Sequence, residues 1–387
     1  MAACVPASCA PPQSALPSPS APSAPSSPLF PPSPLDAWLE AECGGDASLP
    51  FAQRLAQARL AALRATLCHA AAHSLHYKRS LAGFDLAHID AAGLAALPFT
   101  TAQDIVHWQD FLCVSQGDVQ RMVTLRTSGS TGQPKRLAFS PADLARTMSF
   151  FRAGMSQLVH RGERLLVLLP GAERPDGVAD LLRQALASSG VCVLAGNPAA
   201  TAASLKADLM QHRPHALVAA PHQLRALLAL VQQDAVLARN IRREGACGIG
   251  GIQSSGDLLD EATRTALEQC LRCTVLDHFG MTETGYGGGV QCHARQGYHL
   301  RALDVWLEIV DPHTGAVLPD GVQGELVLTT LQREAMPLIR YRTGDAATLL
   351  TQPCLCGSPA PRLGAVAGRY VWEAGRRVVR AVPKGGS

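Results

Sequence analysis

The stretch Thr127-Ser128-Gly129-Ser130-Thr131-Gly132-Gln133-Pro134-Lys135 decides which fold the chain is expected to adopt. It directly follows the apolar residues Val123-Thr124-Leu125. Its glycines permit a tight turn whose backbone N–H groups converge on an anion, while the hydroxyl side chains add donors and Lys135 adds a charge. The Gly-Lys-Ser/Thr ending of the common ATPase P-loop is absent. The stretch predicts a different phosphate-binding loop; the alternative is a flexible Ser/Gly turn.

Two further motifs lie downstream of this loop. They are Asp277-His278-Phe279-Gly280-Met281-Thr282-Glu283-Thr284-Gly285 and Tyr341-Arg342-Thr343-Gly344-Asp345. Alone, the first of them is equally consistent with a glycine turn carrying a surface glutamate. In this order, the three motifs resemble those of the adenylate-forming superfamily, which includes acyl-CoA synthetases, peptide-synthetase adenylation domains and luciferases.

The resemblance implies a binding site for ATP and Mg²⁺. The loop from Thr127 to Lys135 would hold the β- and γ-phosphates. Phe279 and Gly280 would lie at the adenine, Thr282 at the α-phosphate, and Glu283 would bind Mg²⁺. A carboxylate oxygen suits this hard cation, which neutralises charge as the α-phosphate is attacked.

The sugar and the base would contact residues outside the loop. Asp345 would accept hydrogen bonds from both ribose hydroxyls, because two carboxylate oxygens can accept two donors in one plane. Arg369 would also point at the ribose. The loop Ser255-Gly256-Asp257 would lie against the adenine, although it matches the family's Gly-Glu-Pro only loosely. The alternative for this loop is an ordinary connection that caps a helix over residues 259–270.

Within the superfamily, the chain most resembles phenylacetate–CoA ligases. The resemblance covers about residues 50–369 and includes His73-Ser74-Leu75-His76-Tyr77, Leu97-Pro98-Phe99-Thr100-Thr101 and an expected strand, Leu338-Ile339-Arg340, before the ribose aspartate. It implies activation of an aryl or arylacetic acid such as phenylacetate to acyl-AMP, followed by transfer to CoA.

The pocket for the acid is assigned by the same resemblance. It would draw on residues 151–157 and on the glycine-rich segment around Tyr286 and Gly287. His222 would either face this pocket or cap its own helix.

This branch also suggests a metal site. The tight pair Cys354-x-Cys356 lies on a turn, and Cys292 and His299 lie upstream. Three thiolates and an imidazole would complete a tetrahedral structural Zn²⁺ site. The alternative is a pair of partly buried thiols with solvated histidines.

The fold class expected is α/β, with a large AMP-binding domain over residues 35–369. Apolar runs alternate with amphipathic ones, which predicts strands alternating with helices and a mainly parallel sheet. After His299 the pattern predicts a β-rich subdomain. The expected helices are 52–74, 177–188, 204–212 and 222–232, and the expected strands are 165–169, 191–194, 216–219, 305–310 and 325–331.

Composition limits the remaining classes. Residues 1–34 contain no charged Asp, Glu, Lys or Arg and 11 of the 27 prolines, which predicts a disordered tail. The net charge is +3 without a basic block, and no apolar run reaches the roughly 18 residues that a membrane span needs, so neither nucleic acid nor membrane is expected as a partner. Twelve cysteines without a secretory start favour the cytoplasm.

The C-terminal segment 370–387 reads as a truncated hinge and tail. The resemblance implies a small C-terminal domain with a second lysine beyond this point, so turnover by this chain alone is in question. Three hypotheses follow: an acyl-CoA ligase, a non-catalytic nucleotide or acyl binder, and an adenylating enzyme that loads a carrier-protein thiol. A homodimer and a separate C-terminal polypeptide both stay open as partners.

Overall fold

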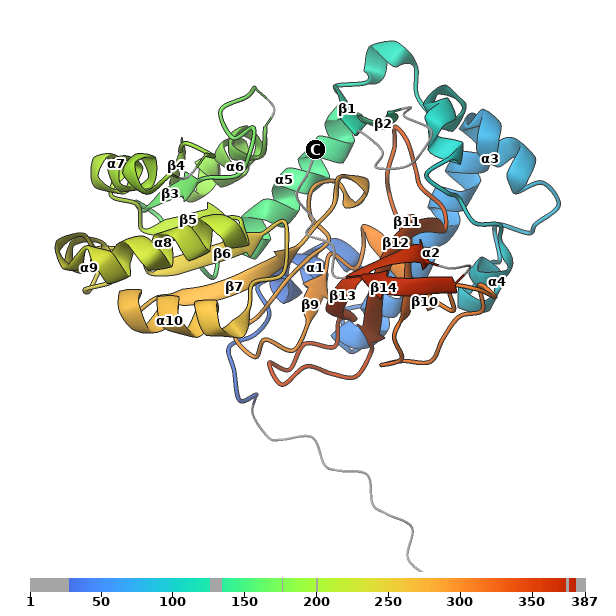
Figure 1. The fold of residues 1–387 in the computed structure, drawn as a ribbon. Helices are drawn as coiled ribbons and strands as arrows, with labels where there is room; N and C mark the ends of the chain where they lie inside the picture. Colours follow the sequence, from blue (N-terminus) through green and yellow to red (C-terminus); the bar gives the residue numbers. More distant parts are fainter. Residues whose placement is uncertain (1–27, 126–133, 176, 200, 374–375, 381–387) are drawn as a thin grey trace, which may run out of the picture.

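The computed structural model describes residues 28–125, 134–175, 177–199, 201–373 and 376–380 (Figure 1). The helices are α1 (Asp36–Cys43), α2 (Phe51–His73), α3 (Leu75–Ser80), α4 (Ala91–Ala96), α5 (Pro141–Met155), α6 (Val178–Leu186), α7 (Ala202–His212), α8 (Pro221–Gln233), α9 (Ala235–Ile241) and α10 (Glu261–Leu271). The strands are β1 (Arg121–Leu125), β2 (Lys135–Phe139), β3 (Arg164–Val167), β4 (Cys192–Ala195), β5 (Ala216–Ala219), β6 (Gly251–Ser255), β7 (Thr274–Phe279), β8 (Gly289–Val290), β9 (Tyr298–Leu300), β10 (Val305–Val310), β11 (Gly324–Thr330), β12 (Tyr341–Leu350), β13 (Arg362–Glu373) and β14 (Arg376–Arg380).

One large mixed sheet runs through the molecule. Its strand order is β10-β11-β12-β13-β9-β8-β7-β6-β5-β3-β4, with β14 added beside β13. Strands β4, β3, β5, β6 and β7 are parallel, and the pairings from β7 to β10 are antiparallel. The predicted α/β class is therefore confirmed, and the β-rich part continues the parallel part as a single sheet. Figure 1 shows α6 to α10 around the parallel half and α2 to α4 near the antiparallel half.

The parallel half is buried on both faces, which explains its continuous apolar runs. On β3, Leu165 and Val167 join the core that includes α5 and α6, whereas Leu166 joins the core formed with α7 to α10. Side chains alternate across a strand, so a strand between two helical layers needs apolar residues at every position. This arrangement brings the carboxyl ends of β5, β6 and β7 to one edge of the sheet.

Most elements expected from the sequence are present. The predicted helices correspond to α2, α6, α7 and α8, and the predicted strands to β3, β4, β5, β10 and β11, with ends that shift by up to two residues. The helix considered over 259–270 is α10, and the side chain of Asp260 caps it by accepting from the backbone N–H of Thr263.

The strand expected at Leu338-Ile339-Arg340 is wrong. Arg340 has a φ of 47°, a left-handed backbone that cannot continue an extended strand, and β12 begins at the next residue. The buried guanidinium of Arg340 forms an ion pair with Glu308 at 3.0 Å. It also donates to the backbone carbonyls of Ala95 and Leu97, at the C-terminal end of α4. These contacts hold the bend that turns the chain into β12.

Candidate functional site

Lys135, Glu283 and Tyr341 meet in one contact group, although they come from three distant parts of the chain. Lys135 is the first residue of β2, Glu283 lies in the 3₁₀ turn Thr282–Thr284 after β7, and Tyr341 opens β12. The ammonium of Lys135 pairs with the carboxylate of Glu283 and donates to the Tyr341 hydroxyl at 3.0 Å. The hydroxyl in turn donates to Glu283 Oε1 at 3.3 Å.

Burial and the Glu283 charge act in opposite directions on the pKa of Lys135 and in the same direction on that of Tyr341. The side chains of Lys135 and Glu283 are only 13% and 7% exposed. Burial alone would lower the pKa of Lys135, but the adjacent Glu283 and Tyr341 outweigh it, and the pKa is raised. Burial, together with the Glu283 charge, raises the pKa of Tyr341 to about 12. Lys135 therefore stays an ammonium and Tyr341 stays a neutral hydroxyl near neutral pH.

A second charged pair lies further along the same strand. Asp345 is fully buried on β12, and its Oδ1 accepts from Arg369 Nε of β13 at 2.8 Å. Arg369 is partly exposed and also donates to the carbonyl of Thr343 at 3.3 Å. Burial lowers the pKa of Arg369, but the Asp345 charge outweighs it and raises the pKa. The residues predicted at the ribose are thus in direct contact with each other.

The predicted phosphate loop lies largely outside the described residues. Thr127, Ser128, Gly129, Ser130, Thr131 and Gly132 are in the segment 126–133, for which no structure is described. Its two flanks are described: Leu125 of β1 and Lys135 of β2 are paired antiparallel.

The residues predicted around the adenine occupy the ends of β6 and β7. Phe279 ends β7, is 5% exposed and packs against Tyr298, with 6.0 Å between ring centroids. A Cβ on Gly280 would lie 2.5 Å from the His278 ring, so this position requires glycine. Ser255, the last residue of β6, is partly buried, whereas Gly256 and Asp257 in the loop that follows are exposed.

A cavity of about 70 Å³ lies next to these strand ends, between α5, α6 and the sheet. Its wall includes Phe151, Gly154 and Met155 of the predicted stretch 151–157, and also Tyr286. Gly287 is not part of the wall, but a Cβ there would lie 2.3 Å from the Phe150 ring, so only glycine fits beside it. The residues that line the cavity are Phe150, Phe151, Gly154, Met155, Leu169, Val178, Leu182, Val218, Gln253, Ser255, His278, Tyr286 and Val290.

His222 lies away from this cavity. It is an exposed residue in the first turn of α8 and is not among the lining residues. It does not cap the helix either, because that contact is made by Gln223, whose side chain accepts from the N–H of Ala220 at 2.8 Å.

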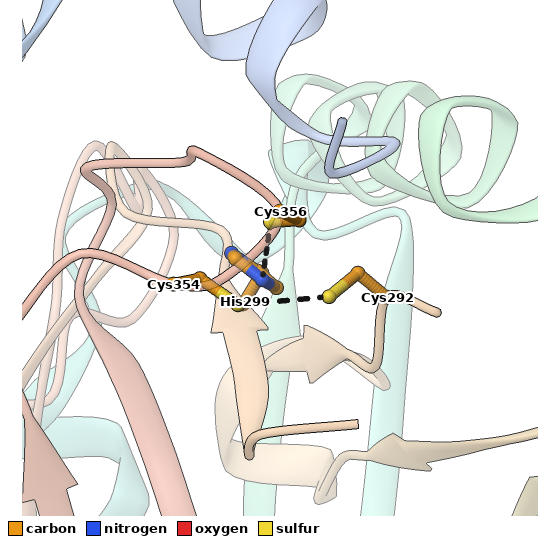
Figure 2. A group of neighbouring side chains, drawn as sticks. All are labelled: Cys292, His299, Cys354 and Cys356. Atoms are coloured by element: carbon orange, nitrogen blue, oxygen red, sulfur yellow. Dashed lines mark hydrogen bonds between the residues drawn. The ribbon is translucent and has the colours of Figure 1, made fainter. Parts of the chain in front are cut away.

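The four predicted metal ligands form one buried cluster (Figure 2). Cys292 follows β8, His299 lies on β9, and Cys354 and Cys356 lie on the turn after β12. The Sγ atoms of Cys292 and Cys354 are 3.8 Å apart, and Cys356 Sγ is 3.5 Å from His299 Nε2. All four potential ligand atoms lie within 4.8 Å of one another. This buried Cys/His cluster has the donor set and the spacing to bind a metal ion.

The comparisons with known proteins agree with this geometry. A family model described as AMP-binding enzyme matches residues 120–332. The chain therefore belongs to the AMP-binding enzyme family, the class that contains the AMP-forming acid–thiol ligases.

Among individual relatives, the chain is similar to phenylacetate-coenzyme A ligases. It is 28% identical to that of Thermus thermophilus over 310 residues, which cover 76% of this chain and 65% of the relative. It is 28% identical to that of Pseudomonas putida over 330 residues, covering 81% and 70% of the two chains. A shorter match of 92 residues to that of Aromatoleum evansii is 47% identical and covers 23% and 21%.

Solved structures show the same fold. A structure of 2-hydroxyisobutyryl-CoA ligase in the postadenylation state has a TM-score of 0.71 at 19% identity and covers 86% of this chain and 72% of that chain. An open conformation of the same ligase has a TM-score of 0.69, with 86% and 79% covered. No helix in the described parts of the chain is long and apolar enough to cross a membrane.

Three residues of the site had no role assigned from the sequence. Tyr341 is the first residue of the motif that ends at Asp345, and its place in that motif was the available signal. Arg333 donates to the backbone carbonyl of Glu283 at 3.2 Å, a contact between distant segments that no local pattern announces. His278 lies within a recognised motif, yet only the fold reveals that its ring faces the cavity.

Proposed function

We propose that the chain activates an aryl or arylacetic acid with ATP, giving acyl-AMP and pyrophosphate, and then passes the acyl group to the CoA thiol with release of AMP. In the first step, an oxygen of the acid bonds to the α-phosphorus and the bond from that phosphorus to the pyrophosphate oxygen breaks. The observation that carries the proposal is the contact group of Lys135, Glu283 and Tyr341, which lies in a member of the AMP-binding family.

The chemistry of this group suits the joining of two anions. Lys135 supplies a buried positive charge for phosphate oxygens, and Tyr341 orients the ammonium through its hydroxyl. Glu283 fits Mg²⁺, since it is a buried carboxylate whose present partner is itself a cation. Bound Mg²⁺ would supply charge neutralisation at the phosphates. Thr282, beside Glu283, would contact the α-phosphate.

The remaining predicted residues would position the substrates. Asp345 would accept from the ribose hydroxyls, with Arg369 holding one of its oxygens. The apolar cavity beside α5 supports an aromatic or small apolar acyl group. Phenylacetate is the first substrate to try because the named relatives are phenylacetate-coenzyme A ligases. The chain aligns with only 65% and 70% of these two relatives, so we propose both the adenylation activity and CoA as the acyl acceptor.

The test is acid-dependent exchange of labelled pyrophosphate into ATP, using a panel of aryl and arylacetic acids. Exchange with at least one acid, followed by thioester formation when CoA is added, supports the proposal. ATP binding without exchange for any acid would replace it with a nucleotide binder. Exchange without a CoA thioester would point to a carrier-protein thiol or a separate C-terminal polypeptide.

We also propose that Cys292, His299, Cys354 and Cys356 hold a structural Zn²⁺. Three buried thiols and an imidazole from three separate segments suit this ion. Bound zinc would tie the turn after β12 to β8 and β9.

Metal analysis of the purified protein should give about one zinc per chain. Cys354→Ser should lose it, whereas Cys247→Ser, at an exposed cysteine, should not. Full thermal stability without zinc would contradict the proposal.

A further inference from the structure

The cavity beside α5 has few polar side chains in its wall, and one of them is His278. Most of its lining is aliphatic or aromatic, contributed by α5, α6, β5 and β8. Among its polar residues, Gln253 is satisfied, because its side chain donates to the Leu276 carbonyl at 3.1 Å. His278 is different: within the described residues, its Nε2 is shielded from solvent and has no hydrogen-bond partner.

The ring of His278 is held in place on several sides. Its Nδ1 lies 3.1 Å from the Ser255 hydroxyl. Gly280 and Gly287 form a cradle around it, since a Cβ on Gly280 would lie 2.5 Å from Cε1 and one on Gly287 would lie 3.1 Å from Nε2. The Phe150 ring lies 6.2 Å away between centroids. The imidazole is therefore positioned by its surroundings.

His278 is uncharged under ordinary conditions. Burial, with a further contribution from the positive charge of Arg301, lowers its pKa to about 4. In a neutral imidazole, one nitrogen donates and the other accepts. The Ser255 hydroxyl can either donate to Nδ1 or accept from it. Nε2 is accordingly either the protonated nitrogen, which donates, or the unprotonated one, which accepts. A hydroxyl on the ligand satisfies Nε2 in either tautomer, whereas a carboxylate satisfies only one.

The size of the cavity limits the ligand. A water-sized site needs about 10–15 Å³, so a cavity of about 70 Å³ has room for roughly five or six such atoms. This corresponds to a single ring or a short chain.

We propose that His278 is a specificity-determining residue that selects a monocyclic acid bearing a ring hydroxyl, with that hydroxyl bonded to Nε2. This inference rests on the proposed function, because it assigns the cavity to the acid that is activated. An unsubstituted ring would leave Nε2 buried and unpaired, which is the usual basis on which a site rejects an analogue lacking a hydroxyl.

The test compares the 2-, 3- and 4-hydroxyphenylacetates with phenylacetate in the exchange assay. For the preferred isomer, the ratio of kcat/KM over phenylacetate should be about tenfold or more in the unaltered protein. His278→Leu should bring the ratio to about one or below, and His278→Gln, which keeps a polar group, should restore part of it. As a control, His160→Leu, at an exposed histidine, should keep the ratio of the unaltered protein.

Direct binding separates this inference from the proposed function. Calorimetric Kd values for the same acids need no turnover. Tighter binding of a hydroxylated acid that is lost in His278→Leu supports the inference even if no acid supports exchange. Equal ratios in the unaltered protein and in His278→Leu, by exchange or by binding, overturn it while leaving the adenylation proposal standing.

Discussion

The two sides of the candidate site differ in whether their buried polar groups have hydrogen-bond partners. On the proposed nucleotide side, Lys135, Glu283 and Tyr341 bond to one another, and Asp345 bonds to Arg369. On the proposed acyl side, His278 lines an apolar cavity, and its Nε2 is buried without a hydrogen-bond partner among the described residues. A buried charge without a partner costs much free energy, so the charged groups proposed for the chemistry are paired with one another. A buried neutral group without a partner costs less, so the imidazole proposed to select the ligand can lack one.

The largest effect should come from breaking the paired side at Glu283. Glu283→Gln removes the carboxylate that would hold Mg²⁺ and leaves Lys135 without its counter-charge. We expect the kcat of acid-dependent pyrophosphate exchange to fall by about 10²- to 10³-fold. The matched control, Glu244→Gln, alters an exposed glutamate and should retain full activity. If the exchange rate of Glu283→Gln stays within about threefold of that of the unaltered protein, Glu283 has no part in the reaction.

A second prediction concerns His278 and the pH dependence of the free energy of unfolding. The folded protein keeps His278 neutral down to about pH 4, whereas the unfolded chain binds this proton below about pH 6.5. Stability should therefore fall as the pH is lowered through this window, by up to about 3 kcal/mol. In His278→Leu the free energy of unfolding, measured in urea, should depend less on pH between 6.5 and 4.

The control for this measurement is His160→Leu, at an exposed histidine, which should keep the pH dependence of the unaltered protein. If His278→Leu and the unaltered protein lose stability in parallel as the pH falls, the imidazole is not held neutral by its surroundings.

A third, smaller effect is expected at the second charged pair. Asp345→Asn keeps the shape of the side chain but weakens its hold on Arg369 and on two ribose donors. The KM for ATP should rise about tenfold, with a smaller change in kcat, because charged hydrogen bonds are stronger than neutral ones. Asp85→Asn, at an exposed aspartate, provides the comparison. An unchanged KM would place the ribose elsewhere.

The smallest effect should follow from Tyr341→Phe. This variant removes only the hydroxyl that bonds to Lys135 and Glu283 and leaves their ion pair intact. The rate of exchange should fall by a few-fold, in keeping with the loss of one hydrogen bond. Tyr298→Phe, at another buried tyrosine of the same sheet, should have no comparable effect on exchange. A loss as large as that of Glu283→Gln would give Tyr341 a larger role than orientation.

Much of the parallel half could be predicted from the sequence, because its signals are local. Strands such as Ala216–Ala219 are short apolar runs between amphipathic helices, and burial on both faces makes that pattern unmistakable. Helix α5 was not among the predicted elements, although Ser140 and Asp143 form a capping box at its N-terminus. Such a box is a local signal for the start of a helix.

The parts that could not be predicted depend on contacts between distant segments. The bend at Arg340 is held by Glu308, and no feature of the local sequence shows that this arginine is buried. Likewise, the motif around Phe279 identifies the family, but the role inferred for His278 depends on the position of α5 and on Gly287. Family motifs predicted the residues of the proposed nucleotide side, whereas the cavity of the proposed acyl side became apparent only from the fold.

The most direct test of the central claim follows the oxygen atoms of the acid. The substrate acid is labelled with ¹⁸O in its carboxylate, and the nucleotide and pyrophosphate formed with ATP and CoA are analysed by mass spectrometry. Attack of the carboxylate on the α-phosphorus predicts one ¹⁸O in AMP and none in pyrophosphate. Unlabelled AMP, or label in another phosphate product, would contradict the account.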